Sequence, residues 1–429
     1  VHDFISAIAS QPETLQLEDT QEDRVVTNFH TGGTTGMPKV AQHTAGGIIY
    51  NAWVVHSVLL DETSVAMCPL PMFHVFAAVI IMGGAMSSGA HIVFPTPAGY
   101  RGDGVFDNFW KLCERHRVTF LIGVPTAFAA LMQRPVDADI SSLKMAFSGS
   151  APLPIELFKK FESSAGLTIC EAYGLTEATC GVAANPPDGE KKVGSVGFAL
   201  PYTDVKMLME TPDGLRECGV DEIGEICISN PGVNVGQTYT EADKNVDLYH
   251  SFGNRDYLRT GDLGRTDADG YIWITGRAKD LIIRGGHNID PAEIEEALSG
   301  HEAVAMVGAI GQPDAHSGEL PCAFVELVAG ASATPEELIA YAEKHIAERA
   351  ALPKYIEILD ELPKTAVGKV FKPDLRRSAI TRIFNEALEK SGSSARVSAV
   401  VEDKKRGLVA QLSGRADADE SIVSKVLGD

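Results

Sequence analysis

The stretch His30-Thr31-Gly32-Gly33-Thr34-Thr35-Gly36-Met37-Pro38-Lys39 combines hydroxyl groups, glycines and a lysine within a short segment. Glycines let backbone N–H groups approach an anion without Cβ clashes, and the threonine hydroxyls add further donors. Lys39 adds a positive charge. The spacing excludes a Walker loop, which requires G-x-x-x-x-G-K-[ST], because Met37-Pro38 separate the last glycine from Lys39. The stretch therefore predicts a phosphate-binding loop rather than a flexible surface turn.

Four more motifs follow this loop in the chain. They are Glu171-Ala172-Tyr173-Gly174-Leu175-Thr176-Glu177, Tyr257-Leu258-Arg259-Thr260-Gly261-Asp262, the stretch from Gly276 to Gly286, and Leu362-Pro363-Lys364-Thr365-Ala366-Val367-Gly368-Lys369. In this order and at these separations, the set resembles the adenylate-forming superfamily of acyl-CoA synthetases, nonribosomal adenylation domains and luciferases. The resemblance covers residues 25–377. Members of this superfamily carry many more residues before the phosphate loop, so we expect the sequence given to be truncated at its N-terminus.

The pattern of apolar residues indicates an α/β fold in three parts. Up to residue 275, short β-branched runs such as 64–67, 91–94 and 118–122 alternate with helical patterns at 106–116 and 126–133, which predicts parallel sheets. The runs 204–207 and 224–228, with a Pro212-Asp213-Gly214 turn between them, predict antiparallel strands of a small β-barrel. Residues 1–276 are thus expected to form a large N-terminal domain. A small, mobile α+β domain should follow at 277–377, with a helix to Ala350, and an appended helix and hairpin at 378–429.

Composition narrows the class of protein. The chain has 37 basic and 58 acidic residues among 429, a net charge of −21, so we expect no nucleic-acid or anionic-lipid partner. Seven cysteines without a C-x-x-C pair indicate reduced thiols and a cytoplasmic location. The longest apolar run, residues 75–86, is too short to cross a bilayer. Composition leaves a homo-oligomeric state open.

The resemblance implies that the chain binds ATP, Mg²⁺ and CoA together with a small carboxylic acid. Joining the acid to AMP would supply a good leaving group. Tyr173 and Gly174 would then hold adenine, Asp262 the ribose, and Arg277 the ribose and phosphate. Thr176 would donate to the α-phosphate, and Glu177 would bind Mg²⁺, which needs only one or two protein carboxylates. The β- and γ-phosphates would contact the loop residues Thr31, Gly32, Gly33, Thr34, Thr35, Gly36 and Lys39.

The remaining site residues carry the two chemical steps that the resemblance implies. Lys369 would bridge the substrate carboxylate and the α-phosphate during adenylation. Lys279 corresponds to the hinge that swings the small domain, withdrawing Lys369 and bringing Arg284-Gly285-Gly286 to the site. His74 matches a position between the acyl pocket and the thiol tunnel, and Gly149-Ser150-Ala151 match the loop beside the acyl carboxylate and adenine.

The function that follows is an ATP-dependent acid:CoA ligase acting through an acyl-adenylate. Loading of a carrier-protein phosphopantetheine is the nearest alternative, and a catalytically silent scaffold is an alternative of another class. The candidate acyl-pocket residues are apolar and include no fixed cation, so the expected substrate is an uncharged hydrophobic acid, fatty or aromatic. These candidates are Val75, Phe76, Gly123, Val124 and Phe128.

Overall fold

The computed structural model describes residues 9, 21–31, 39–365, 368–403, 407–413 and 423. The expected phosphate-binding residues Gly32, Gly33, Thr34, Thr35 and Gly36 lie outside these ranges. Their two neighbours are described, because Thr31 ends strand β1 (Val25–Thr31) and pairs with Lys39 at the start of β2 (Lys39–Thr44). No helix among the described residues is long and apolar enough to cross a membrane.

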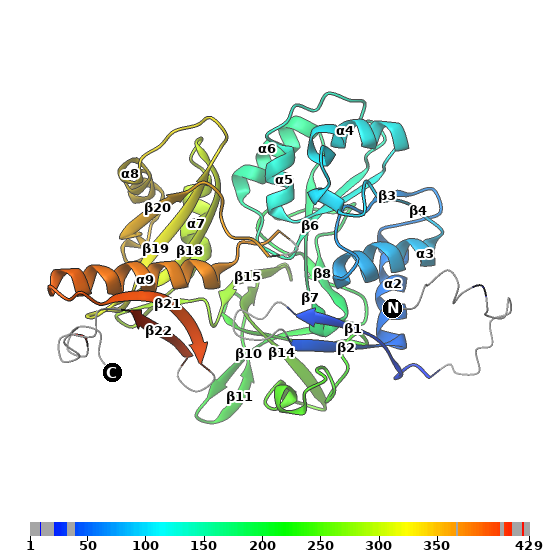
Figure 1. The fold of residues 1–429 in the computed structure, drawn as a ribbon. Helices are drawn as coiled ribbons and strands as arrows, with labels where there is room; N and C mark the ends of the chain where they lie inside the picture. Colours follow the sequence, from blue (N-terminus) through cyan, green and yellow to red (C-terminus); the bar gives the residue numbers. More distant parts are fainter. Residues whose placement is uncertain are drawn as a thin grey trace.

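A seven-stranded sheet in the order β4-β3-β5-β6-β7-β8-β9 organises the large domain (Figure 1). Its strands run parallel from β4 to β7 and antiparallel from β7 to β9, which confirms the predicted α/β class. Carboxyl ends of parallel strands meet at one edge, so the loops after β6 and β7 open onto the same region. The strands are β3 (Val65–Met67), β4 (His91–Val93), β5 (Phe120–Gly123), β6 (Met145–Gly149), β7 (Ile169–Leu175), β8 (Cys180–Ala184) and β9 (Phe198–Ala199).

Helices cover both faces of this sheet and form two hydrophobic cores. Side chains alternate along β5, so Phe120 and Ile122 contribute to one core and Leu121 to the other. In the first core a Cβ built on Gly84 would lie 2.3 Å from Val55 Cγ1, so α2 and α3 pack closely. The helices are α2 (Ala45–Val58), the π-helix η1 (Phe76–Gly83), α3 (Gly84–Ser88), η2 (Gly99–Arg101), α4 (Val105–His116), α5 (Pro125–Leu131) and α6 (Ile155–Ala165).

The strands expected to form a small barrel instead build a six-stranded antiparallel sheet. Pairing among the described strands gives the order β11-β10-β12-β14-β13, with β15 also on β14, and leaves β11 and β13 at the ends. The long strand β14 pairs with β12, β13 and β15 at different points along its length. Its elements are β10 (Asp204–Thr211), β11 (Gly214–Glu217), β12 (Gly224–Ser229), η4 (Ala242–Asn245), β13 (Tyr249–Phe252), β14 (Arg255–Thr266) and β15 (Ile272–Arg277).

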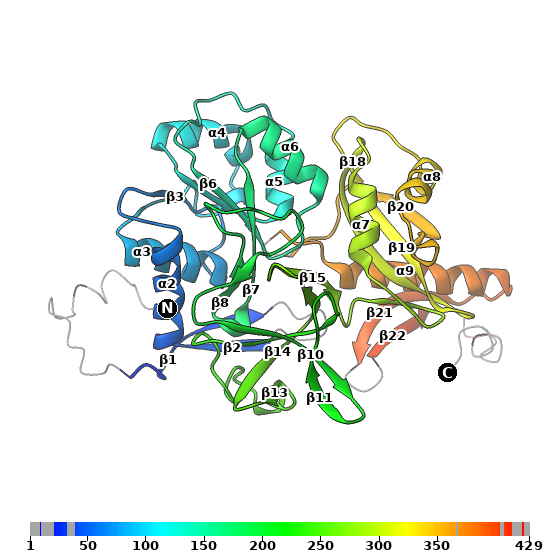
Figure 2. The same ribbon diagram turned by 180° about the vertical axis from the view of Figure 1, so that it is seen from behind.

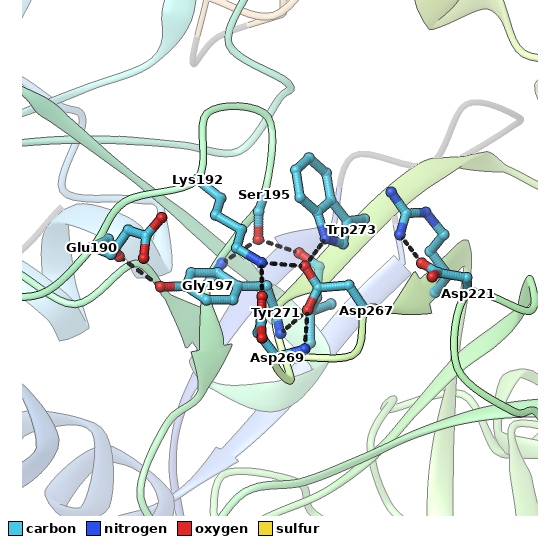
Figure 3. Close-up of polar contacts among 11 residues, drawn as sticks. Glu190, Lys192, Ser195, Gly197, Asp221, Asp267, Asp269, Tyr271 and Trp273 are labelled. Atoms are coloured by element: carbon cyan, nitrogen blue, oxygen red, sulfur yellow. Dashed lines mark hydrogen bonds and ion pairs between the residues drawn. The ribbon is translucent and has the colours of Figure 1, made fainter.

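A polar network fastens the 186–197 segment to the turn between β14 and β15 (Figure 3). Lys192 forms ion pairs with Asp267 at 2.8 Å and Asp269 at 2.6 Å, and its ammonium lies over the ring of Tyr271. Trp273 Nε1 donates to the same Asp267 carboxylate. These contacts hold residues 186–197 against the β14–β15 turn of the six-stranded sheet.

The small domain has its own hydrophobic core, built by Ile282, Ile294, Val307 and Leu338 with their neighbours. Helix α8 ends at His345 rather than at Ala350, because Ile346 turns to an extended conformation and buries its side chain. The elements are β16 (Ile282–Arg284), β17 (His287–Ile289), α7 (Pro291–Ser299), β18 (Val304–Asp314), β19 (Gly318–Leu327), α8 (Pro335–His345), η5 (Arg349–Ala351) and β20 (Tyr355–Leu359).

Helix α9 (Lys372–Lys390) connects the small domain to the C-terminal hairpin. It crosses the expected boundary at residue 377 without a break, because Leu375 packs in a small-domain cluster while Leu388 packs with the hairpin. The hairpin strands are β21 (Arg396–Asp403) and β22 (Gly407–Ser413), which pair antiparallel.

Candidate functional site

A cleft of about 2050 Å³ lies between the large domain and the small domain. The segment between β20 and α9 reaches from the small domain toward this cleft (Figure 1). The cleft is lined by most of the described residues that the sequence singles out: Thr31, Lys39, His74, Gly149, Ser150, Ala151, Tyr173, Gly174, Thr176, Glu177, Asp262, Arg277, Lys279 and Lys369.

Asp262 stands at the centre of the polar part of the cleft. It lies opposite Arg277 in the β14–β15 ladder, and its Oδ1 accepts from Arg277 Nε at 2.7 Å. Its Oδ2 accepts from the hydroxyl of Tyr173 at 2.6 Å. The carboxylate is only 5% exposed, and these two donors fix its orientation. Each oxygen keeps a second lone pair that can accept from a ligand hydroxyl.

Glu177 lies beside the described ends of the β1–β2 hairpin. It belongs to η3 (Thr176–Ala178), directly after β7, and its Oε1 accepts from the hydroxyl of Tyr239. The ring of Tyr239 also lies 4.5 Å from the ammonium of Lys39. Burial lowers the pKa of Lys39, while the negative charge of Glu177 opposes that shift. A carboxylate and an ammonium group thus lie together where the expected phosphate loop begins and ends.

Lys369 lies on a tight turn that the small domain inserts into the cleft. The turn is closed by hydrogen bonds from Thr365 N to Lys369 O at 2.7 Å and from Lys369 N to Thr365 Oγ1 at 3.1 Å. Gly368 has φ +87°, a conformation that favours glycine. Two large-domain side chains hold the turn, because Thr126 donates to Gly368 O at 2.8 Å and Arg101 donates to Thr365 O at 3.2 Å.

Burial, followed by the positive charge of Arg277, lowers the pKa of the Lys369 ammonium to about 8, whereas the negative charge of Asp262 acts in the opposite direction. Burial, followed by the charge of Lys369, lowers the pKa of His74 to about 4, so its imidazole is neutral at pH 7. His74 Nδ1 accepts from Phe76 N–H at 3.2 Å, so the ring proton is on Nε2.

Backbone geometry shapes the loops after β6 and β7. Ser150 has φ +74°, an uncommon conformation for a residue with a side chain. Gly149 lies against the Phe76 ring, and a Cβ on Gly174 would lie 1.9 Å from the carbonyl oxygen of Cys180. Because of this close contact, position 174 requires glycine. Cys180 itself has φ +115°, which is uncommon for a residue with a side chain.

The structure separates Arg284, Gly285 and Gly286 from the other expected site residues. They form the β16–β17 turn, where Gly285 and Gly286 are exposed, and none of the three lines the cleft. Arg284 instead donates to the carbonyl of Ala350 within the small domain. Lys279, between the two domains, does line the cleft and lies close enough to Lys39 to lower its pKa.

The apolar part of the cleft extends between α2, η1 and the sheet. Val75, Phe76 and Val124 line it as expected. Gly123 and Phe128 do not, because Phe128 is 1% exposed in the second core and its ring covers Gly123. Further apolar lining comes from residues that the sequence analysis did not single out: Val54, Val55, Val58, Leu59, Ile80, Phe120, Ile122 and Phe147.

Several polar residues outside every motif contact the site: Tyr239 and Thr126 line the cleft, and Arg101 contacts Thr365, which lines it. Tyr239, Thr126 and Arg101 contact motif residues but are distant from them in the sequence, so no local spacing identifies them. Glu171 opens the motif of residues 171–177, but the motif assigns no role to its side chain. Its carboxylate is 6% exposed and accepts from Gly194 N at 2.8 Å and Leu153 N at 3.4 Å, and burial raises its pKa to about 7.

Glu225, Cys227 and His250 form the one group of three metal-ligating side chains within the described ranges. Arg259 donates to Glu225 Oε2 from Nε at 3.0 Å and from Nη2 at 2.9 Å, and Gly261 N donates to Oε1. The Glu225 carboxylate is thus already occupied by cationic and backbone donors. We assign this group a structural role in the β12–β14 pair.

Comparison with known proteins places this geometry in a family. The AMP-binding enzyme family matches residues 4–239, and the AMP-binding enzyme C-terminal domain matches residues 293–369. A marinolic acid–CoA ligase of Pseudoalteromonas sp. (strain SANK 73390) is 41% identical over 90% of this chain and 60% of its own length. A long-chain-fatty-acid–CoA ligase of Bacillus subtilis (strain 168) is 36% identical over 87% of this chain and 65% of its own length.

A solved structure shares the architecture as well. The anthranilate CoA ligase AuaEII, in complex with anthranoyl-AMP, superimposes with a TM-score of 0.79 at 26% identity and covers 89% of this chain and 72% of that one. The chain thus spans about two thirds or less of the two curated relatives. On its motifs, its two matched domains and this likeness, the chain belongs to the AMP-binding enzyme family.

Proposed function

We propose that the protein is an ATP-dependent acid:CoA ligase that forms an acyl-adenylate and transfers the acyl group to the thiol of CoA. The observation that carries this proposal is the position of Lys369. Lys369 is half-buried and lines the cleft, close enough to Asp262 and Arg277 for their charges to shift its pKa, on a turn that the large domain holds in place. The names of the two relatives and the acyl-adenylate bound to the structural neighbour support the same reaction.

In the first step, a carboxylate oxygen of the acid attacks the α-phosphorus of ATP, and pyrophosphate leaves. Lys369 would place its positive charge between the carboxylate and the α-phosphate, where negative charge develops. The hydroxyl of Thr176 would donate to the same phosphate. Asp262, held by Arg277 and Tyr173, would accept from the ribose hydroxyls. The ring of Tyr173 would lie against adenine.

Residues around Glu177 fit a nucleotide-bound Mg²⁺. The ion prefers oxygen ligands and needs few protein carboxylates, and Glu177 offers one whose orientation the Tyr239 hydroxyl fixes. Bound there, the ion would neutralise phosphate charge. Thr31 and Lys39, which flank the loop between β1 and β2, would hold the β- and γ-phosphates together with the loop residues 32–36.

In the second step, the thiol loses its proton to water and its sulfur attacks the acyl carbonyl. The bond between the acyl carbon and the AMP oxygen breaks, and AMP leaves with its electron pair. His74, with its proton on Nε2, would donate a hydrogen bond toward the acyl group between the apolar pocket and the thiol. Lys369 and the exposed turn Arg284–Gly286 belong to the same small domain and lie apart. We therefore infer that the small domain rotates about Lys279 between the two steps and brings this turn to the CoA arm.

The substrate class follows from the apolar part of the cleft. Its lining favours an uncharged hydrophobic acid, fatty or aromatic, over a dicarboxylate or an amino acid. The seven free cysteines support a reducing location such as the cytoplasm. Loading of a carrier-protein phosphopantetheine remains the competing reaction, because the same two steps would serve it.

An ATP–pyrophosphate exchange assay with a panel of acids tests this function. Hydrophobic acids should support exchange, and added CoA should convert the adenylate to acyl-CoA, detected by mass spectrometry. Exchange without acyl-CoA formation would favour the carrier-protein alternative. No exchange with any acid would contradict the ligase function, and the best exchange with a dicarboxylate would contradict the substrate class.

A further inference from the structure

Helix α6 of the large domain begins without a cap of its own. Its N-cap residue is Pro154, which makes no side-chain capping bond. The first four N–H groups of a helix lack partners within the helix, so an uncapped start is unfavourable unless another group accepts from them. The partner of Ile155 N comes from the other domain.

That partner is Glu296, on helix α7 of the small domain. Ile155 N donates to Glu296 Oε1 at 3.0 Å and to Oε2 at 3.2 Å. Helices α6 and α7 lie on adjacent sides of the two domains (Figure 2), and both contribute residues that line the cleft. A Cβ on Gly300 at the end of α7 would lie 3.8 Å from Cγ of Glu156 on α6. A negative carboxylate at a helix N-terminus also interacts favourably with the helix dipole.

The capped segment leads directly into the cleft. Ile155 follows Pro152 and Leu153, which continue the Gly149–Ala151 loop, and Leu153 N donates to Glu171. Glu171 also accepts from Gly194, in the segment that the Lys192 network fastens (Figure 3). The large domain thus holds one side of this loop, and Glu296 holds the other side when the small domain is in its described orientation.

We propose that Glu296 is a positioning residue that latches the small domain in the orientation that seats Lys369. The proposal rests on the proposed function, because domain rotation between the two steps would break the bond to Ile155 N. The latch uses different contacts from those that Thr126 and Arg101 make with the Lys369 turn. It favours adenylate formation over thioester formation by shifting the equilibrium between two orientations.

Two variants remove the same bond from opposite sides. Glu296→Ala removes the acceptor. Ile155→Pro removes the donor while preserving the helix, since proline is favoured at the first helical position and Pro154, with φ −57° and ψ 135°, already has a conformation that proline tolerates after it. Ile155→Ala keeps the N–H and controls for loss of the side chain. Glu343→Ala, an exposed acid on α8, controls for loss of a small-domain charge.

Single-turnover pyrophosphate release and acyl-CoA formation from pre-made acyl-AMP separate the two steps. Glu296→Ala and Ile155→Pro should each slow the first step by roughly three- to thirtyfold, the range expected for loss of a helix cap, and leave the second unchanged or faster. The double variant should lose no more than either single variant. Amide hydrogen exchange of the peptide containing Ile155 should rise in Glu296→Ala, while both controls behave as the unmodified protein.

Equal losses in both steps, additive losses in the double variant, or unchanged exchange at Ile155 would each overturn the latch. If Glu296→Ala does not fold, Ile155→Pro and Glu296→Gln give the same test, because glutamine keeps an acceptor but loses the charge and should have a smaller effect. A protein that forms no adenylate at all would contradict the proposed function, and hydrogen exchange at Ile155 would still decide whether Glu296 fixes the domain orientation.

Discussion

At the scale of single residues, Lys369 has a strong electrostatic position, and few hydrogen bonds hold its turn to the large domain. Its turn is held to the large domain by the hydroxyl of Thr126 and the guanidinium of Arg101, so the small domain can withdraw it by breaking few bonds. Burial beside Arg277 makes its ammonium more acidic than an ordinary lysine. Both properties suit a cation that is needed in one step and removed for the next.

Lys369→Ala should reduce adenylate formation by about a hundredfold or more, because a charge directed at the transition state contributes roughly 3 kcal/mol. Thioester formation from pre-made acyl-AMP should survive. Lys364→Ala is the matched control on the same turn, since Lys364 pairs with Glu326 and Glu361 inside the small domain. Equal loss of both half-reactions in Lys369→Ala would indicate misfolding or a wrong assignment.

The pH dependence of adenylation follows from the pKa of Lys369, which burial lowers to about 8. The ammonium is charged below this pKa, so kcat/KM for ATP should be level there and fall as the pH rises through it, approaching about tenfold per unit. Exchange rates measured one unit to either side of this pKa test the sign. In Lys369→Arg this fall should disappear, because arginine stays charged. A level profile through pH 8 in the unmodified protein would contradict the role of this group.

The sequence could identify residues inside motifs but not the residues that hold them. Asp262, Glu177 and Lys369 stand at motif positions, and all three line the cleft. Tyr239 and Thr126 reach motif residues only through the fold, at separations of 62 and 242 residues, so their contacts have no local signal. Roles for the motif residues remain predictions until the half-reactions are measured.

At the scale of elements, the β7–β8 corner shows how a sheet shapes the cleft. The two strands pair antiparallel with an irregularity at Gly174, and Cys180 presses its carbonyl oxygen against that glycine. The turn between them contains Thr176 and Glu177. A tight backbone contact thus sets the direction in which these two side chains face.

Gly174→Ala should destabilise the large domain by about 3 kcal/mol or more, since its Cβ would overlap a backbone oxygen that cannot move like a flexible side chain. Gly166→Ala is the matched control. Gly166 has φ +64° but no atom within 4 Å of a built Cβ, so only conformational strain of about 1 kcal/mol is expected. Chemical denaturation of both variants gives the comparison. Similar losses in the two would show that the corner is more adaptable than its geometry indicates.

Element positions were predictable where a local pattern determines them and less so where packing does. The apolar run 118–122 predicted a strand, and β5 lies there, buried on both faces. The end of α8 and the continuity of α9 depend on which core receives Ile346, Leu375 and Leu388, which periodicity does not show. The pairing of β14 with three strands is a tertiary feature that the sequence pattern also does not show.

At the scale of the whole molecule, the two domains have one of the two orientations that the proposed reaction would use. The Lys369 turn is in the cleft, and the Arg284–Gly286 turn is outside it. The chain between the domains passes through a turn at residues 277–281. The backbone N–H groups of Asp280 and Leu281 both donate to Arg277 O. Lys279 lies at the centre of this turn, where a change of few dihedral angles would rotate the small domain.

Lys279→Pro should therefore affect one half-reaction only. Proline fixes φ near −65° and restricts Ala278, while the bonds to Arg277 O and Gly261 O are donated by Asp280, Leu281 and Ala278 rather than by residue 279. Because Lys369 is already seated, we expect adenylation to persist and thioester formation to fall roughly tenfold, which corresponds to a bias of about 1.4 kcal/mol between orientations. Lys279→Ala removes the amine beside Lys39 but leaves the dihedral angles free, so it should retain thioester formation.

Single-turnover rates of pyrophosphate release and acyl-CoA formation measure the two steps. A Lys279→Pro protein that performs both at the unmodified rate would exclude rotation about this residue, and the exposed Arg284–Gly286 turn would then have no route to the cleft.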